Sequence, residues 1–204
     1  MTPRQLSKAL LHLKKDAGLA KLIKKCKEKP VFTRSADTFE SLCKSIIYQQ
    51  LSGKAAGTIH RRFLALYKGV SHPSPKQVAK TSIEKFRTVG VSQQKASYLI
   101  DLAKKFLDGT VDPKHFHEMT DEAIRAHLVA VKGIGRWTAD MFLMFTLHRP
   151  DVLPTGDLGI QKAMKDLFKL RTLPSPEKME KLAEPWRPYR TVACRYLWDS
   201  LDNV

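Results

Sequence analysis

Residues 131–164 read VKGIGRWTADMFLMFTLHRPDVLPTGDLGIQKAM, and this stretch decides the fold. Two glycines, Gly133 and Gly135, stand one residue apart between two runs that have helical periodicity. A dinucleotide-binding glycine motif would follow a β-strand. Residues 120–131 instead begin with a threonine cap and an acidic first turn, which are typical of a helix. The pattern therefore predicts a helix, a tight turn and a second helix.

The same periodicity extends over most of the chain, and no alternating pattern typical of a β-strand accompanies it. Apolar residues recur at helical spacing, with serine or threonine before several runs and glycine or proline after them. We expect an all-α protein of about ten short helices. The clearest predicted helices lie within residues 38–50, 52–69, 92–109, 120–131, 135–148, 157–168, 175–185 and 187–201.

Composition limits the class of protein. The chain has 204 residues, of which 43% are hydrophobic and 27% charged, so it can form a core. No apolar run approaches the roughly 18 residues of a membrane span, and lysines interrupt the N-terminal segment where a signal peptide would be apolar. We expect a protein that is not secreted. The three cysteines, Cys26, Cys43 and Cys194, lie far apart without a CxxC pair, which argues against disulfide, zinc and iron–sulfur sites.

The chain is strongly basic, with a net charge of +16 that is spread along its length. A folded domain of this charge favours a polyanionic partner, and nucleic acid is the leading candidate because neutralising phosphates releases counterions. A generally basic proteome is the other explanation that the charge leaves open. An anionic membrane is less well supported, because no segment is both strongly amphipathic and rich in aromatic residues.

The predicted hairpin suits contact with a phosphate. Glycines permit positive φ angles and close approach of the backbone, and the amides at the start of the second helix would point at an anion. Such contacts hold DNA without reading its sequence. The glycines alone are also compatible with an ordinary helix C-cap. The DNA-binding residues predicted here are Lys132, Gly133, Ile134, Gly135, Arg136 and Thr138.

The motif VKGIGRWTADMF followed by LPTGDLGIQ resembles the helix–hairpin–helix (HhH-GPD) DNA glycosylases, most closely their 3-methyladenine DNA glycosylase II branch. FESLCKSIIYQQLS, GVSQQKASYLIDLA and PWRPYRTVACRYLW resemble further blocks of that branch, in the same order, over residues 36–201. The chain is too short for the N-terminal β-containing domain of the bacterial enzyme. The resemblance therefore implies the compact form.

This resemblance implies one glycosylase domain with two helical lobes and an active-site cleft between them. The central lobe would comprise about residues 36–148, including the hairpin, and the second lobe residues 1–35 and 149–204. It also implies a monomer that binds damaged double-stranded DNA, in the nucleoid of a bacterium or the nucleus of a eukaryote. No cofactor and no catalytic metal are expected, although the hairpin carbonyls could hold a monovalent cation as in relatives.

Asp157 stands immediately before an apolar helical run. Its position is that of an ordinary helix N-cap, for which aspartate is favoured. Capping is compatible with catalysis, because backbone N–H groups that donate to a carboxylate favour its ionised form. A fixed negative charge would stabilise the oxocarbenium-like sugar that forms as a base leaves. The resemblance places the family's catalytic aspartate at Asp157.

Trp137 determines the predicted subclass. Family members that also nick the strand carry a lysine at this place, in a GxGxK pattern, whereas this chain has GIGRW. Water would then be the nucleophile, and no lyase activity is expected. Trp137 is also compatible with a core position. If Trp137 instead lines the base pocket, its ring would attract a purine made cationic by alkylation.

The resemblance assigns further residues to the base pocket and to the DNA interface. Trp137 and Trp198 correspond to aromatic residues of the family's pocket, Met141 replaces a tyrosine of the bacterial enzyme, and Tyr48 and Tyr189 are further candidates that packing would also explain. Extruding a base leaves a gap that must be filled. Gln50 takes the family's plug position, with Leu51 and Ser52 beside it. Arg187 and Arg190 are interpreted as salt-bridging or phosphate-binding residues.

Together these features predict a monofunctional DNA glycosylase that hydrolyses the N-glycosidic bond of alkylated purines, of the 3-methyladenine and 7-methylguanine type, and leaves an abasic site. Two alternatives stay open. One is a glycosylase of the same fold for deaminated or oxidised bases. The other is a non-enzymatic helix–hairpin–helix DNA-binding module, which would need the hairpin but neither Asp157 nor an aromatic pocket.

Overall fold

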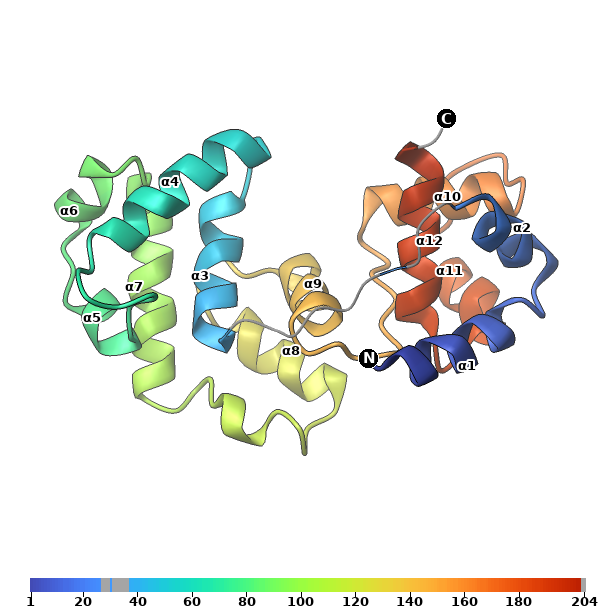
Figure 1. Cartoon of the computed structure of the whole chain (residues 1–204), viewed down its shortest axis with the longest axis horizontal. Helices are drawn as coiled ribbons and strands as arrows, with labels where there is room; N and C mark the ends of the chain where they lie inside the picture. The colour runs from blue at the N-terminus through green and yellow to red at the C-terminus, as the bar shows by residue number, and fades with distance from the viewer. Residues whose placement is uncertain (27–29, 31–36, 203–204) are drawn as a thin grey trace. The chain divides into compact units, whose positions relative to one another are not determined.

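The computed structural model describes residues 1–26, 30 and 37–202. Those residues form twelve α-helices and two short 3-10 helices, and they contain no β-strand (Figure 1). The all-α prediction is confirmed. Within the same residues, no helix has both the length and the apolar character that crossing a membrane requires.

The chain divides into two compact units. The central unit is Ser35–Phe142, and the terminal unit combines Met1–Arg34 with Leu143–Val204. The predicted lobe boundary at residues 35 and 36 lies outside the described residues. At the other boundary the division follows Phe142, within a helix, whereas the sequence placed it near residue 148.

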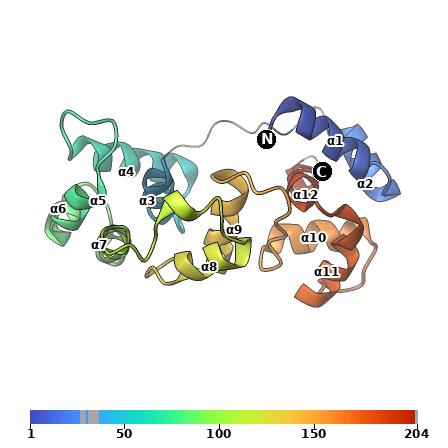
Figure 2. The ribbon, with the colours of Figure 1, turned by 90° about the horizontal axis from the view of Figure 1, so that it is seen from below.

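The central unit is built around its longest helix, α7, which packs against α3, α5 and α6 (Figures 1 and 2). Leu99 and Leu102 on α7 are buried, and so are the stacked rings of Phe63 and Phe86 in the same unit. The helices of this unit are α3 (Thr38–Tyr48), α4 (Gly53–Ala65), α5 (Pro75–Ala79), α6 (Ile83–Thr88), α7 (Gln93–Leu107), η1 (Pro113–His115), α8 (Asp121–Val129) and all but the last turn of α9 (Arg136–Phe145).

Local chemistry explains where α7 begins and ends. The Ser92 hydroxyl accepts a hydrogen bond from the backbone N–H of Lys95, as predicted for the cap, and Gly109 follows the helix at φ +81°. Helices α5 and α6 were not among the predicted helices. They have five and six residues, too few to show a helical period, although Ser74 and Ser82 cap their first turns.

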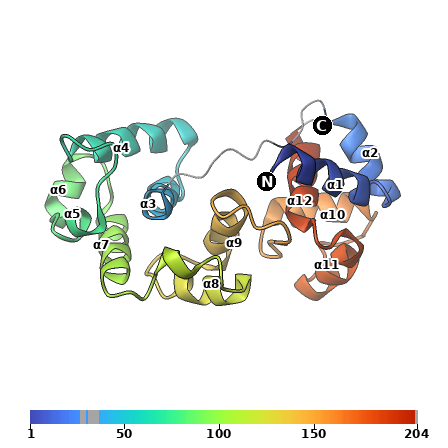
Figure 3. The same ribbon diagram turned by 60° about the horizontal axis from the view of Figure 1, so that its bottom comes forward.

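The terminal unit is centred on α12, which contacts α1, α2 and α10 (Figure 3). Its helices are α1 (Pro3–Leu13), α2 (Ala17–Lys25), α10 (Leu158–Leu167), α11 (Pro176–Ala183), η2 (Glu184–Trp186) and α12 (Arg190–Asp202). The helices α1 and α2 were not predicted, although Thr2 and Asp16 cap them. Trp186, Tyr196 and Leu197 are buried in the core of this unit.

Arg187 and Arg190 form ion pairs in the terminal unit. The Arg190 guanidinium is buried, with Nε 2.7 Å from Asp151 Oδ1 and Nη1 2.6 Å from Glu180 Oε2. Arg187 bonds to Asp151 Oδ2 at 2.6 Å and to Glu184 Oε2 at 2.9 Å. Of the two predicted roles, the structure shows salt bridging, which ties the start of α12 to α11 and to the loop before α10.

Candidate functional site

The predicted helix–turn–helix is present in the central unit. Helix α8 ends at Val129, residues 131–135 form the hairpin turn, and α9 begins at Arg136. Gly133 has φ +80°, the left-handed conformation that glycine adopts without strain. The turn is closed by a hydrogen bond from Ile134 N to Val131 O at 3.1 Å. The first-turn amides of α9, which lack acceptors within their own helix, follow this turn directly.

A buried ion pair fixes the two helices of the hairpin to each other. Arg125 Nε on α8 lies 2.6 Å from Asp140 Oδ1 on α9, and both side chains are nearly inaccessible. Burial raises the pKa of Asp140, while the hydrogen bond from Arg125 opposes that rise. Since removing one partner of such a pair would leave a charge buried, loss of either residue should destabilise the packing of α8 against α9.

The hairpin residues predicted to bind DNA divide into two groups. The side chains of Ile134 and Thr138 are buried, with 3% and 7% exposure, and the backbone N–H of Ile134 already donates to Val131 O. Lys132 and Arg136 are exposed, but the Arg136 guanidinium forms an ion pair with Glu122 at 3.0 Å. The predicted phosphate contact at this turn therefore rests on backbone amides and on the exposed side chains of Lys132 and Arg136, because an exposed ion pair is weak.

The turn between α3 and α4, residues 49–51, is here called the wedge turn. Gln50 has φ +55°, a left-handed conformation that costs a non-glycine residue about 1–2 kcal/mol. Leu51 keeps 39% of its surface exposed, and Ser52 caps α4 by accepting from Ala55 N at 3.4 Å. A strained, exposed turn with an apolar tip is the form that a group inserted into a DNA helix would need.

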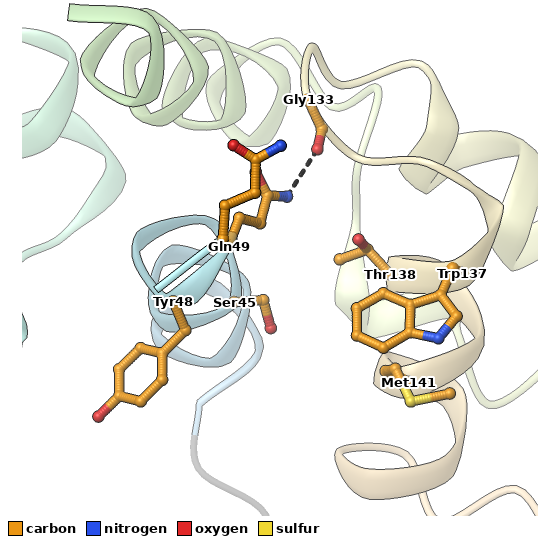
Figure 4. Close-up of a pocket in the computed structure, with 8 residues that line it drawn as sticks. Ser45, Tyr48, Gln49, Gly133, Trp137, Thr138 and Met141 are labelled. Atoms are coloured by element: carbon orange, nitrogen blue, oxygen red, sulfur yellow. Dashed lines mark hydrogen bonds between the residues drawn. The ribbon is translucent and has the colours of Figure 1, made fainter. Parts of the chain in front are cut away.

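The wedge turn is bonded to the hairpin turn and to α7. Gln49 Nε2 donates to the carbonyl oxygen of Gly133 at 2.8 Å (Figure 4). This carbonyl is one of those considered for a monovalent cation. From α7, Lys95 Nζ donates to Ile47 O at 2.8 Å and to Gln49 O at 2.6 Å. Partial burial lowers the pKa of Lys95. These contacts were not predicted from the sequence.

Trp137 and Met141 lie one turn apart on α9 and face a cavity of about 480 Å³ in the central unit (Figure 4). Trp137 is 49% exposed, which excludes the alternative that it is a core residue. The cavity is of the size that small-molecule sites have, and its wall is mainly apolar. Its lining consists of Ser45, Tyr48, Gln49, Gln50, Gly133, Trp137, Thr138 and Met141.

Tyr48 contributes to the cavity wall but is also held by its neighbours. Its ring meets the His60 ring edge to face at 6.1 Å, and Lys44 Nζ lies 5.5 Å from its centroid. A Cβ at Gly57 on α4 would lie 3.5 Å from its hydroxyl, which is an ordinary contact distance. The packing interpretation of Tyr48 thus describes most of its contacts. Tyr189 similarly packs edge to face on His12, in the terminal unit.

Asp157 caps α10 in the terminal unit. Its Oδ1 accepts from the backbone N–H of Ile160 at 2.8 Å and from Trp198 Nε1 at 2.9 Å, and the residue is 9% exposed. Both donors act on the same oxygen, so they fix the orientation of the carboxylate. Asp157 is therefore the N-cap expected from the sequence, and its chemical role stays a prediction.

Trp198 is one of the predicted pocket aromatics, and the structure places it beside Asp157. Gly159 makes this possible, because a Cβ there would lie 3.1 Å from Trp198 Nε1. The Trp198 ring also contacts the ring of Phe145, with centroids 5.9 Å apart. Trp198 thus belongs to the terminal unit with the carboxylate, whereas Trp137, Met141 and Tyr48 belong to the central unit.

Potential metal ligands do not cluster in the parts of the chain that the structure describes. Residues 1–26, 30 and 37–202 contain no group of three or more histidine, cysteine or carboxylate side chains placed to hold an ion. Cys43 is fully buried, and burial raises the pKa of its thiol well above the usual value. A buried, protonated thiol suits a core residue better than a metal ligand or a nucleophile.

Known proteins resemble this chain over most of its length. The family described as "HhH-GPD superfamily base excision DNA repair protein" matches residues 43–188. A relative in Bacillus subtilis (strain 168) is 34% identical over 169 residues, covering 80% of this chain and 59% of the relative, so the chain spans about three fifths of that protein. DNA-3-methyladenine glycosylase 1 of Schizosaccharomyces pombe is 34% identical over 163 residues, covering 79% of this chain and 72% of that protein.

Among solved structures, the chain resembles the Schizosaccharomyces pombe 3-methyladenine DNA glycosylase in complex with abasic DNA. The TM-score is 0.80 at 30% sequence identity, and the match covers 96% of this chain and 97% of the yeast chain. The likeness therefore extends over both units and not over the hairpin alone.

Proposed function

Since the chain belongs to the HhH-GPD superfamily of base excision DNA repair proteins, we propose that it is a monofunctional DNA glycosylase. It removes alkylated purines, of the 3-methyladenine and 7-methylguanine type, from double-stranded DNA and leaves an abasic site. The observation that carries the proposal is Asp157, held in one orientation by Ile160 N and Trp198 Nε1. The names of the relatives support the substrate class.

In the proposed reaction the N-glycosidic bond breaks and its electron pair goes to the base. Alkylation has already made the purine cationic, so it leaves as a neutral molecule and a strong general acid is not needed. The sugar becomes oxocarbenium-like at C1′. Asp157 supplies a fixed negative charge that stabilises it, which is an electrostatic contribution made mainly in the transition state. Water then adds to C1′, and its extra proton passes to the solvent.

The other proposed roles follow from position and chemistry. The hairpin amides and Lys132 bind the DNA backbone, Gln50 and Leu51 fill the gap left by the extruded base, and Trp137 and Met141 contact that base. Trp198 holds Asp157. The protein acts on cellular DNA, in the nucleoid of a bacterium or in the nucleus of a eukaryote. It needs no cofactor.

The direct test is base release from methylated duplex DNA. We expect wild-type protein to liberate 3-methyladenine or 7-methylguanine, identified by chromatography, and to leave strands that break only after alkali or heat. A parallel panel of duplexes with deaminated or oxidised bases tests the alternative substrate classes. Binding to all of these duplexes without release of any base would instead indicate a non-enzymatic DNA-binding module.

Two experiments test the two roles predicted for Trp137. Because no lysine occupies this place, wild-type protein treated with borohydride should form no covalent adduct with DNA. Trp137→Ala should slow release of methylated purines by about 1–3 kcal/mol of lost stacking while changing affinity for undamaged duplex little. Trp137→Phe, which keeps an aromatic face, is the matched control and should lose less.

Either result for Trp137 can contradict the proposal separately. Borohydride trapping through any residue would refute the monofunctional assignment. Normal release by Trp137→Ala would instead remove Trp137 from the base pocket and leave the reaction type unaffected.

The basic charge predicts strong dependence of DNA binding on salt. With a net charge of +16, affinity for undamaged duplex should fall about 40-fold between 50 and 200 mM salt if three phosphates are neutralised. Lys132→Ala should reduce the slope of log affinity against log salt by about one. Lys178→Ala on α11 removes the same charge elsewhere and serves as the control. Affinity that does not change with salt would point to a partner other than DNA.

A further inference from the structure

One face of α7 contacts both of the turns that are proposed to bind DNA. Lys95, Tyr98 and Asp101 are spaced three residues apart and therefore lie along one side of the helix, over about 9 Å. Lys95 bonds the wedge turn, Tyr98 packs against Gly133, and Asp101 Oδ2 accepts a hydrogen bond from Lys132 N at 2.8 Å. These three residues are here called the α7 strip.

We propose that Lys95 is a positioning residue that sets the wedge turn relative to the phosphate-binding hairpin, so that binding of the backbone and insertion of residues 50 and 51 occur in register. The α7 strip is the rigid element that keeps the wedge turn and the hairpin in this relative position. The inference rests on the proposed function, because it concerns how that site extrudes a base.

The contacts of Lys95 are unlike ordinary helix capping. Basic side chains often bond the last carbonyls of their own helix. Lys95 instead reaches the carbonyls of Ile47 and Gln49 from a different helix, 48 and 46 residues away in sequence. Its ammonium group is partly buried, and burial opposes its charge. The ammonium group keeps this place because it donates to two backbone carbonyls, and these two bonds fix the end of α3.

The conformation of Gln50 shows why the turn needs support. Gln50 directly follows the carbonyl that Lys95 binds and has φ +55°. Glycine would adopt this conformation without strain. The position is nevertheless occupied by glutamine, whose side chain is proposed to enter the DNA duplex. Strain of this kind persists only where surrounding contacts hold it. The bonds from Lys95 supply those contacts on one side of the residue.

The second link joins the wedge turn directly to the hairpin. Gln49 Nε2 donates to Gly133 O at 2.8 Å (Figure 4). Gly133 is in turn the residue against which Tyr98 packs, so the wedge turn, the hairpin and α7 form a closed set of contacts within the central unit. Displacing Lys95 would release the turn from α7 while leaving the hairpin held by Tyr98 and Asp101.

Lys95→Met is the decisive variant, because it keeps the length of the side chain and removes its donors. Lys104→Met, at an exposed position near the end of the same helix, removes the same charge and is the control. We expect Lys95→Met to slow single-turnover release of 7-methylguanine paired with cytosine about tenfold or more, since small misplacement of a positioning group has effects of this size. Lys104→Met should behave as wild type.

A mismatch separates positioning from general damage to the fold. Extrusion is easier when the lesion is mispaired. The defect of Lys95→Met should therefore shrink to about threefold or less when thymine stands opposite the lesion. Lys95→Arg, which can donate to both carbonyls, should restore release. Gln49→Leu should show the same pairing-dependent defect, and it tests the link independently if Lys95→Met is too unstable to assay.

A fluorescence measurement tests the inference without excision. Wild-type protein should increase the emission of 2-aminopurine placed beside an abasic-site analogue in a duplex, because insertion of the wedge turn unstacks it, and Lys95→Met should do so less at saturating protein. Equal defects on paired and mismatched lesions, or unchanged release and emission, would overturn the inference. Wild-type protein that unstacks the probe but releases no base would contradict the proposed function and leave the inference standing.

Discussion

Asp157→Asn is expected to lower single-turnover base release at least about 100-fold, the scale seen when one electrostatic stabiliser of a transition state is lost. The expected effect on folding is small. Ile160 N and Trp198 Nε1 bond the same carboxylate oxygen, Oδ1. An asparagine oxygen can take that place, and asparagine is as good an N-cap as aspartate. The measurements are release rate, duplex affinity and unfolding midpoint.

A second aspartate in the terminal unit provides a matched control. Asp16 caps α2 by accepting from Leu19 N at Oδ1, and it accepts from Trp186 Nε1 at Oδ2, 3.0 Å away. Asp16→Asn must turn its amide group toward one of these donors, so it should lose about 1–2 kcal/mol of stability and keep its activity per folded molecule. Near-normal release by Asp157→Asn would rule out the proposed mechanism.

Gly133→Ala is expected to produce the second large effect, on folding and DNA binding together. Gly133 has φ +80°, and a Cβ there would overlap the ring of Tyr98. Backbone strain and overpacking together should cost about 2–4 kcal/mol in the free energy of unfolding. Because the hairpin must distort to relieve the overlap, affinity for undamaged duplex should fall as well. Denaturant unfolding and a binding titration measure the two effects.

Gly135→Ala separates the two reasons for a glycine in this turn. The position of a Cβ at Gly135 has no neighbour within 4 Å, so the fold itself accepts a side chain there. Unchanged stability with weakened DNA binding would show that Gly135 leaves room for a phosphate. Unchanged binding would contradict the proposed contact. For Gly133, the double variant with Tyr98→Ala should recover part of the lost stability, because it removes one of the two overlapping groups.

The fold could be predicted where its cause is local. Ser92, Thr120 and Asp157 each cap the helix expected from the sequence, since a cap needs only the residues two or three positions ahead. The paired glycines predicted the hairpin because a tight turn also depends only on residues close in sequence. The short α5 and α6 lacked enough residues for a period. The predictions also omitted α1 and α2, although Thr2 and Asp16 cap them.

The site residues that the sequence could propose were those with distinctive chemistry in a recognisable motif. Asp157, Trp137 and the hairpin residues fall into this group, and their roles stay predictions until the variants are measured. The burial of Thr138 was not foreseen, nor was the ion pair that engages Arg136. Lys95 was simply one lysine among many in a basic chain, because nothing local distinguishes a lysine that reaches another helix.

The sequence by itself determined the helical class, the hairpin, the basic charge and the resemblance to DNA glycosylases, because these depend on periodicity, caps, composition and contiguous motifs. The tertiary structure alone decided which groups meet. It placed Trp198 Nε1 on Asp157 across 41 residues, and Lys95 on the carbonyl of Gln49 across 46. It also set Gln50 at φ +55°. Contacts over such separations arise from packing of whole helices, and local sequence carries no signal of them.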